Sequence, residues 1–586
     1  MVAPFNHKTE QTVSAPSPAT KPSWRFGDLP AAELMPPLQQ YLYAQDAKAN
    51  WQLVWLNNDG QPIIGLLPTV SWSVYYGAND PPPSDKQETL YKVEKTCRAS
   101  HHIHHSTVTT TYMCYSEWQD ELIAYSQAYN IDSNSNDSHS TFKTNKKPNY
   151  HHGLIGFIGY DIAAHELSPA SNIELAAQPC ALLGHYDIYL TPKKNDNSGW
   201  QLEVNSTANA SNKDIDEEQK NKLVIALIAY LDALDKKLSD KHPNRKNINQ
   251  AQLETSSAPA SLLLNARWGK RHYQQAFGQT QNYLQQGDCY QINLTQEWQG
   301  RLTHTQSTSN IIDYLPALHR NTQAPFAGYL AIQHLNDNAN SNKPDNSTER
   351  TSSFELLSCS PELFFTFIKD GATGKHHIRT KPIKGTMPRG ATAEQDNNYK
   401  QQLIDSEKDR AENVMIVDLL RNDLGKYAKI GSVKVPQLFA IESFSNVHHM
   451  VSTITAELRT DTHPLAVLFG SLPAGSITGT PKKRAVEIIS ELENAPRGAY
   501  CGTMGYMNFD GSGQWNVLIR TLQATSTADD VANNTKQVSL WAGGGITVAS
   551  DCDAEYQECL DKVGNLLSVL AKTARGCIEF KSAAAR

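Results

Sequence analysis

The stretch YCGTMGYMNFDGSGQWNVLIRTLQAT, residues 500–525, contains two runs of β-favouring residues on either side of DGSG. A glycine-containing turn between such runs is typical of a β-hairpin. A third run, KQVSLWAGGGITV at 536–548, follows after a polar segment. The three runs therefore predict β-strands of an antiparallel sheet.

Helical patterns surround these strands. Residues 398–428 form a long one, and residues 554–574 form another. In PKKRAVEIISELE, residues 481–493, Pro481 suits a first helical position and the apolar residues recur at the spacing of an amphipathic helix. The sequence thus predicts an α+β fold with antiparallel sheet.

Composition limits the class of protein. The chain has 586 residues, 39% hydrophobic and 19% charged, with a formal net charge of −7. This balance disfavours a nucleic-acid partner, which favours a basic face. No run of about 18 apolar residues is present, which argues against a membrane-spanning helix. The nine cysteines show no C-x-x-C spacing, so neither a disulfide framework nor a zinc site is expected, and a reducing cytoplasm fits best.

Polar segments divide the chain. Residues 1–23 lack an apolar signal region and are expected to be a disordered leader. Residues 236–258 are expected to be a linker or insertion. They separate an N-terminal region, 24–235, with polar insertions, from a C-terminal region, 259–576, that is dense in sequence motifs.

Further polar segments predict surface insertions. They cover residues 131–148, 193–221 and 335–353, which are too poor in apolar side chains to offset the entropy of ordering. The histidine-rich HHIHH at 101–105 is expected to lie in an exposed insertion. Metal binding is the less favoured reading, because no nearby cysteine or carboxylate cluster completes a site.

Two glutamates lie where a carboxylate needs a partner. Glu412 shares the apolar, core-facing stripe of its helix, and carboxylates are rarely buried unless they are paired. The simpler explanation is a salt bridge with Arg410 or Arg421, or an exposed helix edge. Glu558 precedes Lys562 by four residues, so a surface Glu–Lys pair is its simpler explanation.

Glycine-rich segments accompany these carboxylates. PAGSITGTPKKRA, residues 473–485, runs into a helix N-terminus, which favours anions, although an ordinary capped helix also explains it and the P-loop pattern is absent. GGG at 543–545 offers backbone N–H donors at the end of a strand. Two carboxylates that can share a hard cation beside anion-binding loops indicate an enzyme acting on a small anion with Mg²⁺.

Seven motifs follow one another in the C-terminal half. They are PIKGT (382–386), AENVMIVDLLRNDL (411–424), HHMVS (448–452), GSITGTPKKRA (475–485), RGAYCGTMGY (497–506), LIRT (518–521) and GGGITVASDCDAEYQECLDK (543–562). Together they resemble the chorismate-utilising enzymes, which include anthranilate synthase component I, aminodeoxychorismate synthase component I, and the isochorismate and salicylate synthases. The resemblance is close over 265–575 and weak at GLIGFIGYD (153–161). It implies two facing antiparallel β-sheets flanked by helices, with the active site between them.

The resemblance also implies roles for individual residues. Mg²⁺ would be held by Glu412 and Glu558. Glu362 would be the general acid/base, and His449 would lie near the ring carboxylate and the leaving oxygen. The implied substrate contacts are Gly385, Thr386, Ser476, Tyr500, Arg520, Gly545 and Lys562.

Lys384 indicates one branch of the family. Anthranilate synthases resemble PIAGT at this motif, whereas PIKGT resembles the aminodeoxychorismate synthases. Isochorismate-forming members carry a water-activating lysine where this chain has Gln291, which argues against water as the nucleophile. The implied reaction is amination of chorismate at C4 to 4-amino-4-deoxychorismate, a precursor of para-aminobenzoate and folate. The Lys384 amine would attack C2 as the C4 hydroxyl leaves, and ammonia would then attack C4 and expel the lysine.

The nitrogen source is expected to lie on another chain. The sequence contains no G-x-C-x-G nucleophile elbow, so ammonia would come from a glutamine amidotransferase subunit. The nearest alternative is anthranilate synthase component I, which forms anthranilate and pyruvate. A catalytically inactive regulatory or scaffold homologue is the alternative of another class. Whether the N-terminal half binds tryptophan stays open.

Overall fold

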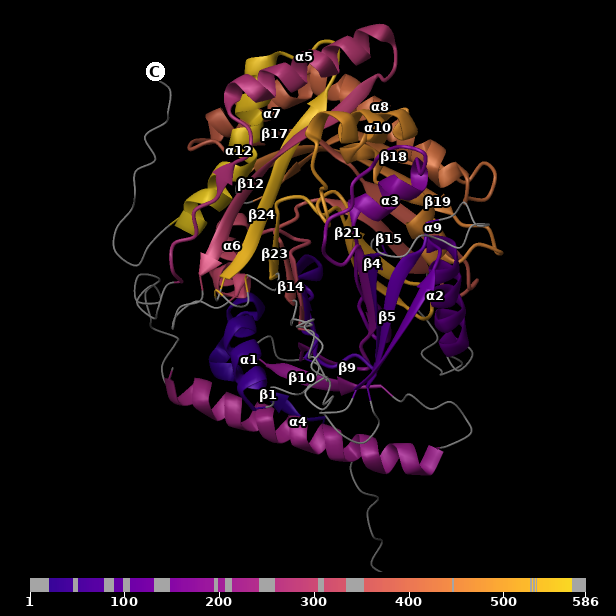
Figure 1. The fold of residues 1–586 in the computed structure, drawn as a ribbon, viewed down its shortest axis with the longest axis vertical. Coiled ribbons are helices and arrows are strands. Elements are labelled where there is room, and N and C mark those ends of the chain that lie inside the picture. Colours follow the sequence, from indigo (N-terminus) through magenta and orange to yellow (C-terminus); the bar gives the residue numbers. More distant parts are fainter. Residues whose placement is uncertain are drawn as a thin grey trace, which may run out of the picture.

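The computed structural model describes residues 21–45, 51–77, 89–98, 106–130, 148–193, 199–205, 213–241, 259–303, 310–333, 353–444, 447–526, 530, 533 and 535–571. Two 12-stranded antiparallel sheets dominate it, with helices around them (Figure 1). The helices are α1 (Ala31–Gln45), α2 (Tyr115–Asn130), α3 (Tyr160–Leu167), α4 (Lys213–Lys241), α5 (Lys270–Gln286), α6 (Leu315–Thr322), α7 (Ala393–Asp405), α8 (Glu407–Gly425), α9 (Pro464–Ser471), α10 (Lys482–Glu493) and α12 (Cys552–Ala571).

The first sheet joins both halves of the chain. Its strands in spatial order are β1 (Ser23–Trp24), β10 (Trp200–Val204), β9 (Ile188–Pro192), β3 (Ile63–Gly65), β2 (Val54–Leu56), β13 (Gly328–Gln333), β14 (Ser353–Ser358), β23 (Thr521–Ser526), β24 (Thr535–Ile546), β12 (Gln291–Thr303) and β11 (Asn265–Ala266), and β20 (Gly479–Thr480) pairs with β12.

The second sheet likewise contains strands from both halves of the chain. Its order is β17 (Ile383–Pro388), β19 (Val447–Glu457), β16 (His376–Lys381), β15 (Leu363–Lys369), β22 (Gly513–Asn516), β21 (Thr503–Asn508), β7 (Gly153–Ile158), β8 (Ala181–His185), β4 (Val70–Tyr76), β5 (Tyr91–Arg98) and β6 (Ser106–Met113), and β18 (Lys434–Ser443) pairs with β19.

An apolar core lies between the sheets. Phe157 of β7 and Phe354 of β14 bring their ring centroids to 5.4 Å, and Leu56 and Tyr506 belong to the same buried cluster. The inward faces of both sheets are therefore apolar, as expected for facing sheets.

The predicted hairpin forms, but its second strand is shorter than expected. β21 pairs with β22 in register Met507↔Gly513 around the DGSG turn. The run 515–525 then leaves the second sheet after Asn516 and continues as β23 in the first. Sequence periodicity does not record such a change of sheet, because both pieces are buried strands.

A second crossing segment runs antiparallel beside this one. The chain passes from β14 to β15 between Ser358 and Leu363. The Val517 amide donates to the Glu362 carbonyl at 3.1 Å, and the Cys359 amide donates to the Arg520 carbonyl at 3.0 Å. Two crossing segments are thus hydrogen-bonded to each other where the sheets meet.

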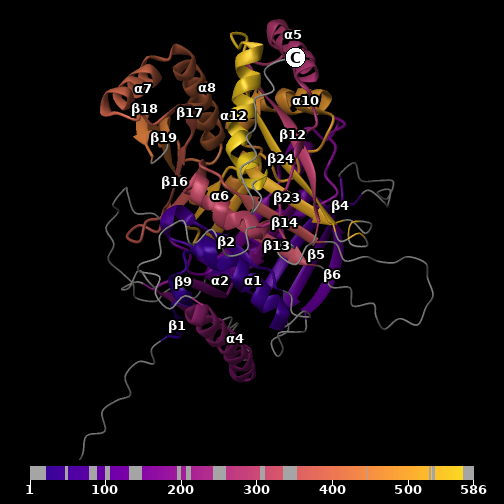
Figure 2. The same ribbon diagram turned by 90° about the vertical axis from the view of Figure 1, so that its left-hand side faces the viewer.

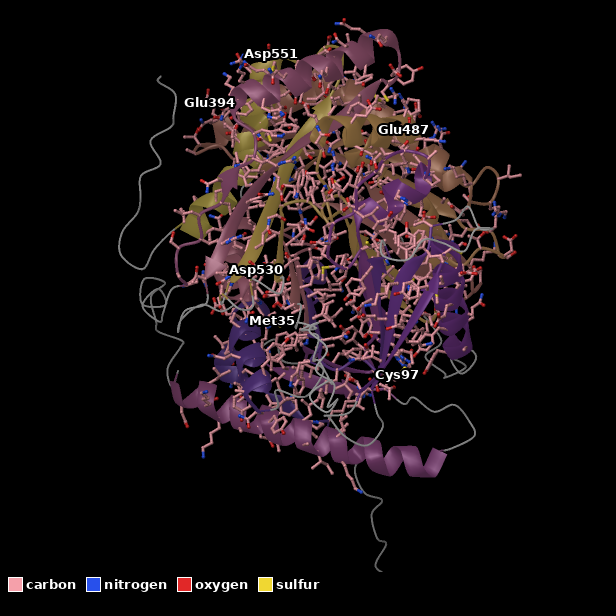
Figure 3. The ribbon with its side chains drawn as sticks, viewed as in Figure 1. Met35, Cys97, Glu394, Glu487, Asp530 and Asp551 are labelled. Atoms are coloured by element: carbon pink, nitrogen blue, oxygen red, sulfur yellow. The ribbon has the colours of Figure 1, made fainter. Side chains whose placement is uncertain are left out.

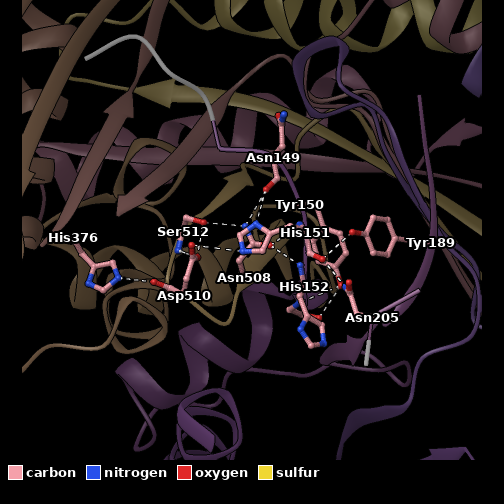
Figure 4. A network of polar contacts seen from close by, with 11 residues as sticks. Asn149, Tyr150, His151, His152, Tyr189, Asn205, His376, Asn508, Asp510 and Ser512 are labelled. Atoms are coloured by element: carbon pink, nitrogen blue, oxygen red, sulfur yellow. Dashed lines mark hydrogen bonds and ion pairs between the residues drawn. The ribbon is translucent and has the colours of Figure 1, made fainter. Parts of the chain in front are cut away.

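Polar contacts attach the hairpin turn to the N-terminal half (Figure 4). Asn508 accepts from the His151 amide at 3.0 Å and donates to the Asn149 carbonyl at 3.0 Å. The His151 carbonyl in turn accepts from Tyr189 and Asn205. The N-terminal region therefore supports the strands that carry the C-terminal motifs.

The helices follow the sequence patterns with one break. The 481–493 and 554–574 patterns form α10 and α12. The 398–428 pattern divides into α7 and α8 at Ser406, whose hydroxyl accepts from the Asp409 amide and caps α8. Figure 2 shows α7, α8 and β17–β19 on one side of α12, with α5 and α10 on the other.

The structure contradicts one prediction of a polar insertion, and several other predicted segments lie wholly or partly outside the described residues. The insertion predicted at 193–221 contains β10, whose Trp200 and Leu202 are buried, and the beginning of α4, so the loop prediction is wrong there. The 236–258 segment begins inside α4, and its residues from 242 onward lie outside the described part. The segments 131–147 and 334–352, HHIHH and nearly all of the 1–23 leader also lie outside it.

The described residues bear on two further expectations. None of their helices is both long and apolar enough to cross a membrane. The eight cysteines among them are free thiols.

A buried ion pair ties α10 to β12. Arg497 and Glu493 have side chains that are each 1% exposed, with Nη2 of Arg497 2.6 Å from Oε1 of Glu493. Arg497 also donates to the Asn293 carbonyl at 2.7 Å, and Glu493 accepts from the Thr295 amide at 2.9 Å. Removing one charge would leave the other buried and uncompensated.

We therefore expect Glu493→Gln to lower the free energy of unfolding by about 3–5 kcal/mol. Glu491→Gln is the matched control, because Glu491 lies on the same helix with a half-exposed side chain and pairs with Arg484 at 3.4 Å. The control should change stability by less than about 1 kcal/mol. Urea denaturation measures both, and equal effects would contradict the buried-charge explanation.

Candidate active site

Lys384 lies on an irregular part of β17. The pairing of β17 with β19 shifts register between Ile383 and Thr386, and Gly385 between them has φ +80°. A Cβ on Gly385 would lie 2.7 Å from Leu403 and 2.9 Å from Asp409, so only glycine fits. Such bulges redirect neighbouring side chains. The Lys384 side chain is 16% exposed, and its Nζ lies 3.7 Å from Oε2 of Glu412.

Glu412 projects from α8 into the same space. It is buried, and its Oε1 has no hydrogen-bond partner among the described residues. Burial raises the pKa of this carboxyl above its usual value, although Lys384 and Lys408 act against the rise. The proposed arginine partners are wrong, because Arg421 pairs with Asp418 and Arg410 lies over a phenylalanine ring.

Helix α12 provides the facing wall. A Cβ on Gly544 would lie 3.1 Å from Oε2 of Glu555, 3.8 Å from Nζ of Lys562 and 4.0 Å from Oε1 of Glu558. The triple glycine therefore lets the α12 side chains approach the backbone of β24. Lys562 donates to the Gly543 carbonyl at 2.8 Å.

The Glu558–Lys562 pair predicted as the simpler explanation is present, at 2.8 Å. Burial opposes ionisation of Glu558, but Lys562, Lys408 and Lys384 outweigh it, and the pKa of Glu558 lies below its usual value. The pair is thus part of a larger group of charges that includes residues of α8 and β17.

Glu362 lies on the crossing segment before β15 and is buried. Burial raises the pKa of its carboxyl to about 7. Four groups act in the opposite direction: the charges of Lys384, Lys562 and Arg520, and a hydrogen bond from Ser476. A carboxyl with this pKa is suited to proton transfer near neutral pH.

His449 of β19 faces Thr386 of β17, with Nδ1 and the threonine Oγ1 at 2.8 Å. Burial, together with the positive charge of Arg520, lowers the pKa of His449 to about 4. The imidazole is therefore neutral at physiological pH. It can act as a hydrogen-bonding group beside an anion without adding charge.

Gly545 and Gln291 complete the wall opposite Lys384. A Cβ on Gly545 would lie 2.3 Å from Nε2 of Gln291 and 3.4 Å from Nζ of Lys384. Gln291 is buried, and no residue in the described part of the chain forms a hydrogen bond with its Nε2. An unpartnered amide facing an amine marks a place where a ligand can bind.

The structure brings most of the predicted site residues together. The group comprises Glu362, Lys384, Gly385, Thr386, Glu412, His449, Ser476, Arg520, Gly545, Glu558 and Lys562. Tyr500 is placed differently, buried and stacked on Trp541 at 6.1 Å beside Arg497. Its role as a substrate contact stays a prediction.

Sequence reasoning missed Glu555 and Lys408. Glu555 precedes Glu558 by three residues and so shares its helix face, which is a signal the sequence contains. Lys408 pairs with Glu555 at 3.0 Å across two helices, and no sequence pattern connects these positions. Figure 3 shows the end of the molecule that contains α7 and α12. Glu394 of α7 and Asp551, just before α12, lie there, away from Met35 of α1.

The site residues offer the oxygen donors that a hard divalent cation needs, but their present spacing is not that of a bound ion. Among the described residues, no three His, Cys, Asp or Glu side chains are already gathered to hold a metal ion. The charges of Glu412, Glu555 and Glu558 nevertheless all act on Lys408 and raise its pKa. Oε1 of Glu412 is buried and has no hydrogen-bond partner within the described ranges. Oxygen donors of this kind are those that Mg²⁺ prefers.

Comparison with known proteins agrees with this geometry. A family model described as chorismate binding enzyme matches residues 94–568. Aminodeoxychorismate synthase component 1 of Salmonella typhimurium is 37% identical over 423 residues, which are 71% of this chain and 76% of that protein. The protein of the same name from Escherichia coli is 39% identical over 335 residues, 56% of this chain and 65% of that one.

Other members are more distant. Anthranilate synthase component 1 of Aquifex aeolicus is 29% identical over 428 residues, 72% of this chain and 75% of that protein. The crystal structure of anthranilate synthase component I from Streptococcus pneumoniae has a TM-score of 0.57 at 20% identity, over 86% of this chain and 91% of that one. The expected fold of two facing sheets flanked by helices is confirmed, and this chain belongs to the family of chorismate-binding enzymes.

Proposed function

We propose that this chain is component 1 of an aminodeoxychorismate synthase, which transfers ammonia to C4 of chorismate and forms 4-amino-4-deoxychorismate for para-aminobenzoate and folate synthesis. The observation that carries the proposal is Lys384, partly buried beside the carboxyl groups of Glu362 and Glu412. Three curated relatives with 37–42% identity carry the name aminodeoxychorismate synthase component 1.

Lys384 is the proposed nucleophile. Lys384 first gives up a proton to solvent. Its Nζ then forms a bond to C2 of chorismate, the ring double bonds shift, and the C4–O bond breaks. Protonated Glu362 donates its proton to the departing hydroxyl, which leaves as water. Ammonia then bonds to C4, the double bonds shift back, and the C2–N bond to Lys384 breaks. Two displacements of modest difficulty replace one difficult substitution.

The surrounding charges orient the substrate. Arg520 and Lys562 lie near Glu362, where they can hold the carboxylates of chorismate. His449 and Thr386 form a neutral hydrogen-bonding pair beside them. Glu412 and Glu558, with Glu555, would hold Mg²⁺, which when bound would neutralise the ring carboxylate of the substrate.

We also infer a partner and a compartment. The relatives are named as component 1, which supports a second component, and we propose a glutamine amidotransferase that supplies ammonia. The free thiols of the described cysteines support a reducing cytoplasm.

Product identification tests the function. Incubation with chorismate, an ammonium salt and Mg²⁺ should give 4-amino-4-deoxychorismate, identified by mass and NMR. Para-aminobenzoate should form only after a separate lyase is added. Anthranilate fluorescence without that lyase would instead support an anthranilate synthase, and absence of turnover by folded protein would support an inactive homologue.

Lys384→Ala should nearly abolish amination, because the first displacement loses its nucleophile. Lys375→Ala is the matched control, since Lys375 pairs with Glu457 at 2.9 Å with a side chain that is 41% exposed. Intact-protein mass spectrometry with chorismate should detect an adduct of chorismate less one water on the unmodified protein and on the control. Full activity of Lys384→Ala would contradict covalent catalysis.

The pKa of Glu362 predicts a pH dependence. A carboxyl with a pKa of about 7 loses the proton needed for the leaving group as pH rises through that value. At a constant concentration of free ammonia, kcat/KM should therefore fall above about pH 7, while His449, whose pKa is about 4, should add no limb between pH 5 and 9. Glu362→Gln should remove this limb and lower kcat about 10²–10⁴-fold. A limb that persists in Glu362→Gln would assign it to another group.

Gly545→Ala should block the space between Gln291 and Lys384, because its Cβ would lie 2.3 Å from the amide. We expect the KM for chorismate to rise and kcat to fall. Gly564→Ala on α12 is the control, since a Cβ there would meet no atom within 4 Å. Steady-state kinetics of both variants, with circular dichroism to verify folding, checks the prediction. Unchanged kinetics of Gly545→Ala would show that this space is not used.

A further inference from the structure

Three carboxylates and three lysines face one another between β17, α8 and α12. Lys384 of β17 lies 3.7 Å from Glu412 of α8. Lys562 and Glu558 pair within α12 at 2.8 Å. Lys408 of α8 pairs with Glu555 of α12 at 3.0 Å. The group is therefore already balanced in charge.

Lys408 occupies a position that its own helix disfavours. It is the second residue of α8, where the helix dipole repels cations. It also precedes Glu412 by four residues, and a lysine N-terminal to its glutamate is the weaker order for such a pair. The strongest attraction comes from outside the helix, from Glu555.

Glu555 depends on this contact. Its side chain is 2% exposed, and the same oxygen, Oε1, also accepts from the Ser550 hydroxyl at 2.7 Å. Nζ of Lys408 lies 4.0 Å from Oε1 of Glu412, the buried oxygen for which the described part of the chain offers no hydrogen-bond partner. One ammonium group thus lies between carboxylates of two different helices.

A divalent cation that enters this group would give it a net charge of two positive units. One lysine must then withdraw, because like charges a few ångströms apart repel. Lys408 is the most exposed of the three, at 48% against 36% for Lys562 and 16% for Lys384. Lys562 is also held by the Gly543 carbonyl. The described contacts that hold Lys408 are those with Glu412 and Glu555, so Lys408 can turn to solvent once it leaves these two carboxylates.

We propose that Lys408 is a positioning residue that acts as the resident counter-ion of the acidic group: it holds α8 to α12 while no divalent cation is bound, and it competes with that cation for Glu412 and Glu555. The inference rests on the Mg²⁺ site of the proposed function. Lys408 thereby sets the concentration of Mg²⁺ at which the site is loaded.

Thermal unfolding against Mg²⁺ concentration, without substrate, tests the proposal. Lys408→Met should unfold at a lower temperature than the unmodified protein when Mg²⁺ is absent, because the buried carboxylate of Glu555 loses its positively charged partner and keeps, among its described contacts, only the Ser550 hydroxyl. Its half-saturating Mg²⁺ concentration should fall about fivefold or more, the smallest effect expected for one unit charge at about 4 Å. Lys400→Met is the control for the loss of one lysine, since Lys400 pairs with Asp396 on α7 at 3.4 Å.

Lys408→Arg gives a second test should the methionine variant fail to fold. A guanidinium can grip Glu555 with two parallel hydrogen bonds, so it should compete more strongly and raise the half-saturating Mg²⁺ concentration. The opposite shifts of the two variants, with no shift in the control, are the expected result.

Two results would overturn the proposal, and they are distinguishable. If Mg²⁺ stabilises the unmodified protein and both Lys408 variants with one midpoint, Lys408 does not compete with the cation, while the Mg²⁺ site stands. If Mg²⁺ stabilises none of the proteins, the divalent site itself is wrong and Lys408 is only a structural link between the helices.

Discussion

The free-energy cost of burying charged groups governs the structure of the candidate active site. Glu362, Glu412 and Glu555 are buried carboxyl groups, and burial of a charge is tolerated only with a partner close by. Lys384 reaches Glu412 from β17, and Lys408 reaches Glu555 from α8. Each of these pairs joins two elements, so the same contacts that solvate the carboxylates also fix β17, α8 and α12 against one another.

Close backbone approach is the second requirement of this arrangement. Gly385 brings β17 against α7 and α8, and Gly544 and Gly545 bring β24 against α12 and Gln291. A Cβ at Gly385 or Gly545 would collide with these neighbours, and a Cβ at Gly544 would press against Glu555. The glycines therefore set the width of the site, while the lysines and glutamates set its charge.

Much of this was predictable from sequence. The hairpin, α10, α12 and the ordered motifs gave the fold and most of the site, because each has a local signal such as a turn, a helical period or a short motif. Contacts between distant elements were not predictable. The pairing of Lys408 with Glu555 and the split of residues 515–525 between two sheets depend on tertiary packing, which a local pattern does not record.

Tyr500 and the arginines near Glu412 show the same limit in another way. The motif around Tyr500 matches the family, yet its ring packs on Trp541 within the core. Arg410 and Arg421 lie near Glu412 in sequence, yet their side chains serve other contacts. The helical pattern indicates that Glu412 needs a partner. Only the three-dimensional structure shows that Lys384 is close enough to be that partner.

The two crossing segments have a mechanical consequence. Residues 359–362 and 517–520 each belong to a chain that continues into both sheets, and they are hydrogen-bonded to each other. Sliding of one sheet over the other would strain these short segments, which carry Glu362 and Arg520. Glu362, the proposed proton donor, and Arg520, the proposed substrate-binding cation, thus lie on two segments that are hydrogen-bonded to each other, which limits how far they can move apart.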